Sequence, residues 1–239
     1  MNYNELNFNV SSRERELSMS AAFPVLMRKV YVWMTLALVL TGATAYGVAT
    51  SPGVITALYS NSILLWGLVI AEFAIVFGVS AAINRLSLTT ATLLFVLYSV
   101  INGALFSSIF LIYTMSSIAS VFFITAGTFG VMALVGYTTK KDLSSMGKIL
   151  FMALIGIIIA TIVNIFLKSS GLEMIVSYLG VLVFVGLTAY DTQKIKNMLM
   201  MASDASEASQ KYALLGALTL YLDFINLFIY PLRIFGRRE

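Results

Sequence analysis

Apolar residues occur in seven long runs along the chain, and most polar residues lie between these runs. Each run is close to the roughly 20 residues that a helix needs to cross about 30 Å of hydrocarbon. The runs are Val30–Thr50, Ser62–Ile83, Leu88–Tyr113, Ile118–Thr138, Ile149–Leu167, Met174–Asp191 and Tyr212–Leu232. The pattern therefore predicts an all-α membrane protein with seven transmembrane helices.

The polar residues before the first run and after the last one divide the chain into three parts. We expect a polar N-terminal tail at 1–29, one membrane domain at 30–232 and a basic C-terminal tail at 233–239. A secretory signal would place its apolar run nearer to residue 1, so the first run is interpreted as a retained span. The polar connection Thr192–Lys211 is expected to form a short surface helix or a loop.

Lysine and arginine residues in the connections predict the orientation in the membrane. Eleven of the fifteen basic residues fall on the side of the N-terminal tail, and basic residues accumulate on the cytoplasmic side. The N-terminus is therefore expected in the cytoplasm. Arg233, Arg237 and Arg238 would lie outside if the last run crosses fully. These three basic residues on the outer side mark the seventh run as unusual. It either crosses the membrane fully, or it is re-entrant or shielded by the other helices.

Composition excludes several classes of protein. Hydrophobic residues make up 59% of the chain and charged residues only 11%, whereas soluble domains carry about 25% charged residues. A soluble enzyme and a disordered chain are excluded. A nucleic-acid partner is not expected despite the net charge of +4, because the basic residues form no large patch. Without Cys or His, thiolate and imidazole chemistry and the metal sites built on them are also excluded.

Three acidic residues lie inside the apolar runs: Glu72, Asp191 and Asp223. Ionisable groups within a membrane span are costly and are candidates for function. At about 1.5 Å per residue, Asp223 lies roughly 16 Å into the last run, near the middle of the membrane. Asp191 lies toward the cytoplasmic end of its run, and Glu72 lies further out. Arg85 follows the second run on the cytoplasmic side, so these depths allow a cluster of Arg85 with Asp191 and, less closely, Asp223.

Helical spacing adds polar neighbours to both aspartates. Asn226 shares a stripe with Asp223, and Thr188 shares one with Asp191. Such stripes also serve helix packing and structural hydrogen bonding, which is the plainer interpretation. Two facing aspartates can share a proton and titrate as a coupled pair. The cluster could be a pH-sensitive latch, or a site for a hard cation such as calcium; the residues alone leave both open.

Three stretches resemble the Bax inhibitor family, also called the transmembrane Bax inhibitor motif family. They are the segments Gly136–Ser144, Leu187–Ile195 and Leu220–Phe228. The resemblance covers about residues 25–236, and the short tails favour a bacterial member in the inner membrane. It implies a fold of six helices surrounding a central seventh. One departure is Pro231, which removes a backbone donor and is expected to end or kink the last helix.

The resemblance also implies a function, a calcium leak gated by pH. In the family, two aspartates form the pH sensor and an arginine of the second helix latches onto them; Asp191, Asp223 and Arg85 match these positions. A family glutamate falls near Glu72. The expected ion pathway comprises Glu72, Asn226 and Thr188. Asp191 and Asp223 are the candidate calcium ligands, calcium is the expected transported ion, and no cofactor is expected.

Two other functions stay open at this stage. A non-conducting regulator would bind other membrane proteins, such as a protease or stress and death machinery, through the polar N-terminal tail. An intramembrane aspartyl protease also places an aspartate after a tyrosine, as in Tyr190-Asp191. However, Leu220-Tyr221-Leu222 stands where such proteases need glycines, so the chain is not expected to be an enzyme. The expected partners are the lipid bilayer, calcium ions and membrane proteins.

Overall fold

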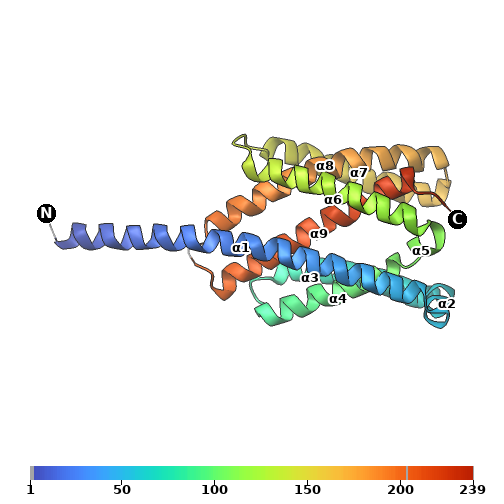
Figure 1. Cartoon of the computed structure of the whole chain (residues 1–239), viewed down its shortest axis with the longest axis horizontal. Coiled ribbons are helices and arrows are strands. Elements are labelled where there is room, and N and C mark those ends of the chain that lie inside the picture. The colour runs from blue at the N-terminus through green and yellow to red at the C-terminus, as the bar shows by residue number, and fades with distance from the viewer. Residues whose placement is uncertain (1–2, 203, 239) are drawn as a thin grey trace.

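The computed structural model describes residues 3–202 and 204–238, and within them the chain is a bundle of helices (Figure 1). Seven of the helical segments are long and apolar enough to cross a membrane, as the hydropathy pattern predicts. The elements are α1 (Tyr3–Ala49), α2 (Pro52–Ser60), α3 (Ser62–Ala82), α4 (Leu88–Phe106), α5 (Ile109–Ile112), α6 (Met115–Thr138), α7 (Ser144–Leu167), α8 (Ser170–Met200) and α9 (Glu207–Phe235).

Several helices extend beyond the apolar runs. Helix α1 runs without a break through the predicted end of the polar tail, and its first turns project far out of the bundle (Figure 1). Helix α8 continues to Met200, so the connection to α9 is six residues, 201–206, and the longer predicted connection Thr192–Lys211 is wrong. Hydropathy locates only the part of a helix that lies in lipid. The polar turns that extend the same helix into water are not detected by it, so the helix is longer than its apolar run.

The third apolar run is interrupted in the structure. Helix α4 ends at Phe106, and the remaining residues form the short helix α5 after a turn at Ser107. The Ser107 hydroxyl donates to the carbonyl oxygen of Ala104 at 2.6 Å. This local hydrogen bond competes with helix continuation, and hydropathy does not reveal it.

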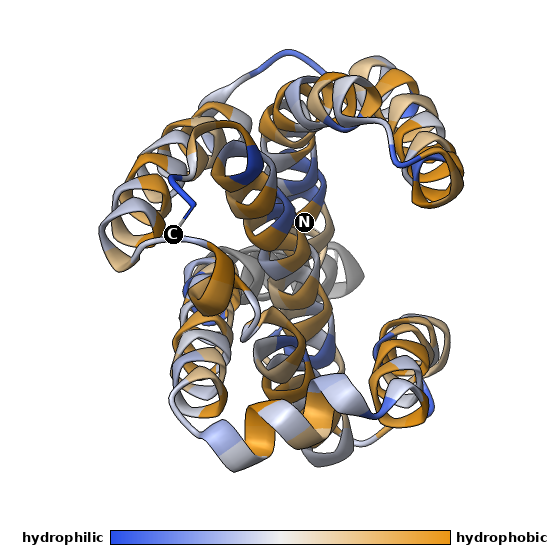
Figure 2. Cartoon of the chain, turned by 90° about the vertical axis from the view of Figure 1, so that its right-hand side faces the viewer, coloured by the Kyte–Doolittle hydropathy of each residue, from blue (hydrophilic) through white to orange (hydrophobic). Residues whose placement is uncertain are grey.

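Helix α9 is the most buried span of the bundle. It packs against α1, α4, α6 and α8, whereas α3 packs mainly on α4, and α7 packs on α8. In the view along the bundle, most of the ribbon is coloured as hydrophobic (Figure 2). Helix α9 is thus an interior helix, but the expected arrangement of six helices surrounding it is not confirmed by this packing.

Helix α9 runs the length of the bundle, and the C-terminus lies at the end opposite the projecting turns of α1 (Figure 1). Pro231 does not end it, since the helix continues to Phe235. Proline has no N–H, so the carbonyl oxygen of Leu227, four residues earlier, loses its helical partner. The hydroxyl of Thr125 on α6 donates to that oxygen at 3.5 Å. A neighbouring helix therefore compensates for the missing donor.

Direct backbone contact joins α6 to α8 at Gly136. A methyl group added there would lie 2.8 Å from the carbonyl carbon of Ala189 and closer still to its oxygen. Only glycine permits this approach, as at other close helix crossings in membranes. Because Ala189 precedes Asp191 by two residues, this contact helps to position the aspartate.

Candidate functional site

The two predicted aspartates meet at the interface of α8 and α9, the most extensive helix pair in the bundle. Asp191 is 9% exposed and Asp223 is 4% exposed. The two carboxyl groups are close enough to interact electrostatically. Oxygen Oδ2 of Asp223 is buried and has no hydrogen-bond partner in the described part of the chain. The structure therefore places both residues at one helix interface, and their role as a pH sensor stays a prediction.

A cavity of about 830 Å³ lies beside the aspartate pair. Its lining comes from α3, α4, α7, α8 and α9, and it includes Glu72, Asp191, Asp223 and Asn226. Oxygen Oε1 of Glu72 is buried without a hydrogen-bond partner among the described residues. Three carboxylates from three helices thus line one space, although Glu72 is far from the aspartates in sequence. We call this space the acidic cavity.

The other predicted pathway residues differ in their surroundings. Asn226 lines the acidic cavity, and its Nδ2 donates to the carbonyl oxygen of Leu222 at 2.8 Å. Thr188 is fully buried, its hydroxyl donates to the carbonyl oxygen of Phe184 at 2.7 Å, and it is not among the lining residues. Asn226 therefore faces the cavity, whereas Thr188 is satisfied within its own helix.

Arg85 lies in the turn between α3 and α4, where its side chain is exposed. It does not line the acidic cavity. The predicted latch of Arg85 onto the aspartates is thus not formed in this conformation, and its role stays a prediction. Among residues 3–202 and 204–238, no group of three or more acidic, His or Cys side chains is arranged to hold a metal ion. The expected calcium ligands therefore also stay a prediction.

Two lysines at the cavity were missed by the sequence analysis. Lys148 and Lys194 line the acidic cavity, and both side chains are exposed. Lys194 interacts electrostatically with Asp191, and its Nζ lies 5.9 Å from the centre of the Tyr190 ring. The three-residue spacing of Asp191 and Lys194 on one helix is a signal that could have revealed this pair. No comparable signal links Lys148 on α7 to the aspartates.

A second cavity, of about 620 Å³, lies beyond the acidic cavity toward the C-terminal end of α9. Its charged lining residues are Glu173, Arg233 and Arg238. Neighbouring residues of α9 line different spaces: Tyr230 lines the acidic cavity and Ile229 the second one. The Tyr230 ring stacks on Phe184, with 5.8 Å between ring centres. Both rings of this aromatic pair line the acidic cavity.

Comparisons with known proteins agree with this fold and its motifs. The model of the family described as inhibitor of apoptosis-promoting Bax1 matches residues 24–239. The chain is 54% identical over 220 residues to the inner membrane protein YbhL of Escherichia coli (strain K12), covering 92% of this chain and 94% of that protein. It is 46% identical over 213 residues to a protein of Borreliella burgdorferi, covering 89% and 92%. The chain belongs to the Bax inhibitor family.

Proposed function

We propose that this protein is a multi-pass inner membrane protein that leaks calcium ions through the acidic cavity, and that it is not an enzyme. The observation that carries the proposal is the meeting of Glu72, Asp191 and Asp223 in one cavity of a membrane-spanning bundle. Calcium is a hard cation that prefers carboxylate and amide oxygens, and Asn226 adds an amide. The similarity to an inner membrane protein supports the location.

The aspartate pair makes the proposed leak sensitive to pH. Two buried carboxyl groups that repel each other favour a state in which one of them is protonated, so the charge of the pair depends on pH. The charged side chains around the pair are Glu72 from α3, Lys148 from α7 and Lys194 from α8. Protonation weakens the attraction of the pair for a cation. It also weakens the attraction for Arg85, which could reach the pair only by turning inward.

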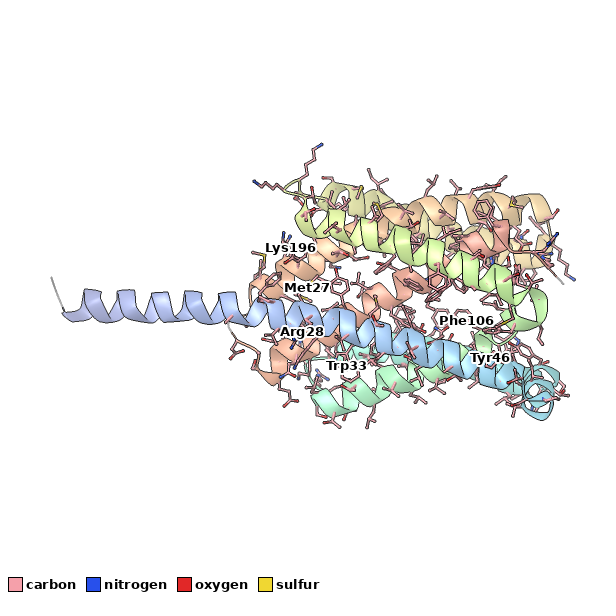
Figure 3. The ribbon with its side chains drawn as sticks, viewed as in Figure 1. Met27, Arg28, Trp33, Tyr46, Phe106 and Lys196 are labelled. Atoms are coloured by element: carbon pink, nitrogen blue, oxygen red, sulfur yellow. The ribbon has the colours of Figure 1, made fainter. Side chains whose placement is uncertain are left out.

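The cytoplasmic N-terminus is part of the same proposal. Figure 3 shows Arg28 and Lys196 at the end of the bundle from which α1 projects, and Tyr46 and Phe106 toward the other end. Lys196 donates to the carbonyl oxygen of Tyr137 at 2.7 Å, at the C-terminal end of α6. Basic residues at this end support its placement on the cytoplasmic side.

Calcium flux in liposomes tests the leak directly. Purified protein is reconstituted with a calcium-sensitive dye inside, and flux is measured from about pH 5 to pH 8, the range over which coupled carboxyl groups in membranes can titrate. Asp191→Asn and Asp223→Asn should each change the flux and flatten its pH dependence. Asp142→Asn is the matched control, because Asp142 is exposed and outside the cavity. Unchanged flux and pH profile in both cavity variants would refute the proposal.

The projecting part of α1 favours a second candidate, a regulator that binds another membrane protein. The backbone of this part of the helix extends beyond the bundle (Figure 1). Deletion of residues 1–20 separates the two functions. If the deletion abolishes a cellular phenotype but leaves calcium flux intact, the regulator is favoured. If the deletion leaves the phenotype intact and only the aspartate variants abolish it, the leak is favoured.

A further inference from the structure

The acidic cavity is far larger than a passing ion requires. Its volume of about 830 Å³ falls within the roughly 300–1,000 Å³ typical of sites for organic ligands. Most of the side chains around it are apolar or aromatic. The cavity therefore has the size and the walls of a binding site for a bulky molecule with an apolar body.

Aromatic rings supply much of the wall. Seven aromatic side chains line the cavity: Phe73, Phe77, Tyr98, Phe151, Phe184, Tyr190 and Tyr230. Ring faces attract cations, most strongly where water is excluded, and organic cations of low charge density are the ligands that aromatic cages recognise. The rings thus favour a cation whose charge is spread over, or surrounded by, apolar groups.

The carboxylates select the sign of the ligand's charge. Asp223 lines the cavity and is 4% exposed, and its Oδ2 has no hydrogen-bond partner among the described residues. Glu72 on α3 also lines the cavity, and its buried Oε1 likewise has no partner in that part of the chain. Buried carboxylate oxygens without partners are costly, and a cation between them would satisfy both. Lys148 and Lys194 also line the cavity, but they are exposed and can turn their charge into water.

Helices α3 and α7 each contribute to the cavity wall. Helix α3 packs mainly on α4 and helix α7 packs on α8, and in the described part of the chain α3 and α7 are not among the helix pairs in close contact with each other. Phe77 on α3 and Phe151 on α7 line the cavity, and their side chains are 67% and 59% exposed. A ligand dissolved in the membrane can therefore reach the cavity between α3 and α7 without crossing the bundle.

We propose that the acidic cavity binds an amphipathic organic cation, with a positive centre between Glu72 and Asp223 and an apolar body against the aromatic wall, and that this ligand enters from the lipid between α3 and α7. This inference goes beyond the calcium leak and does not depend on it. A cation held in this place would occupy the space that the proposed calcium pathway uses.

Binding of tetraphenylphosphonium, a bulky apolar cation, tests the proposal. Equilibrium dialysis is performed on protein in lipid nanodiscs without calcium, with empty nanodiscs as the reference for partitioning into lipid. We expect saturable binding of about one cation per chain and no saturable binding of tetraphenylborate, which has the same shape and a negative charge. Glu72→Gln and Asp223→Asn should each weaken the binding by about tenfold or more, as expected when a buried charge partner is lost.

Two further variants are measured in the same binding experiment, so that it still gives an answer if Glu72→Gln or Asp223→Asn folds poorly. Phe77→Ala removes an exposed part of the aromatic wall and should also weaken binding, whereas Glu173→Gln, in the second cavity, should leave it unchanged. Binding no greater than in empty nanodiscs would overturn the proposal. So would equal binding of both probes, or equal affinity in the wild type, Glu72→Gln and Phe77→Ala. Because no calcium is present, these results stand apart from success or failure of the flux measurement.

Discussion

Replacement of Gly136 by alanine should separate α6 from α8 and destabilise the bundle. The added methyl group would lie 2.8 Å from the carbonyl carbon of Ala189, whereas ordinary contacts begin near 3.4 Å. The two backbones must therefore move apart by at least about 0.6 Å, and neither can turn away as a flexible side chain would. Overpacking of this kind costs about 1–3 kcal/mol. We expect the free energy of unfolding of Gly136→Ala to fall by that amount.

Gly130→Ala is the matched control for this experiment. Gly130 lies on the same helix, and a methyl group added there meets nothing within 4 Å. Alanine favours a helix over glycine by up to about 1 kcal/mol, so this variant should be as stable as the wild type or slightly more stable. Unfolding is measured in mixed micelles with increasing sodium dodecyl sulfate. Equal stability of Gly136→Ala and Gly130→Ala would refute the close backbone contact. 

Three other predictions concern separate parts of the chain. Thr125→Val should lower the free energy of unfolding by about 0.5–1.5 kcal/mol, because it leaves the Leu227 carbonyl oxygen without its donor; Thr125→Ser should retain most of the stability. Tyr230→Ala should raise calcium flux in liposomes, because it removes a ring from the wall of the acidic cavity and widens it; unchanged flux would place the pathway elsewhere. Hydrogen bonds from Ser144 lower the pKa of Asp142 below its usual 3.8, so their stabilisation of the first turn of α7 is present above that pH and is lost below it. Amide exchange protection at Ser144 should fall in acid, and Asp142→Asn should remove this dependence.

The positions of the membrane spans could be predicted from the sequence because lipid imposes a strong pattern. A run of about 20 apolar residues has few alternatives to a spanning helix. To within one residue, six of the seven runs each lie in a single helix, and the third is divided between α4 and α5. The polar turns could not be predicted from this pattern, because lipid does not constrain them. Residues 192–200 of α8 and the start of α1 therefore differ from the expectation.

The candidate site was partly predictable for a similar reason. Asp191 and Asp223 are charges in apolar runs, and this alone marks them for function. Their partners depend on three-dimensional packing, which one sequence does not reveal. Lys148 on α7 lines the acidic cavity, and Gly147 beside it lets the Tyr190 ring pack closely against the same helix. Arg85 was expected at the aspartates from the family resemblance, yet a turn residue can face water, as it does here.

The burial of α9 has a consequence for the order of synthesis. The helix that packs against α1, α4, α6 and α8 is the last of the seven to leave the ribosome. Until α9 is inserted, the inner faces of the other six helices are covered by lipid or by the insertion machinery. The buried aspartate pair cannot form before that step, because Asp223 lies on the last helix. Assembly of the site is therefore also the completion of the fold, and a chain that stalls before α9 has neither.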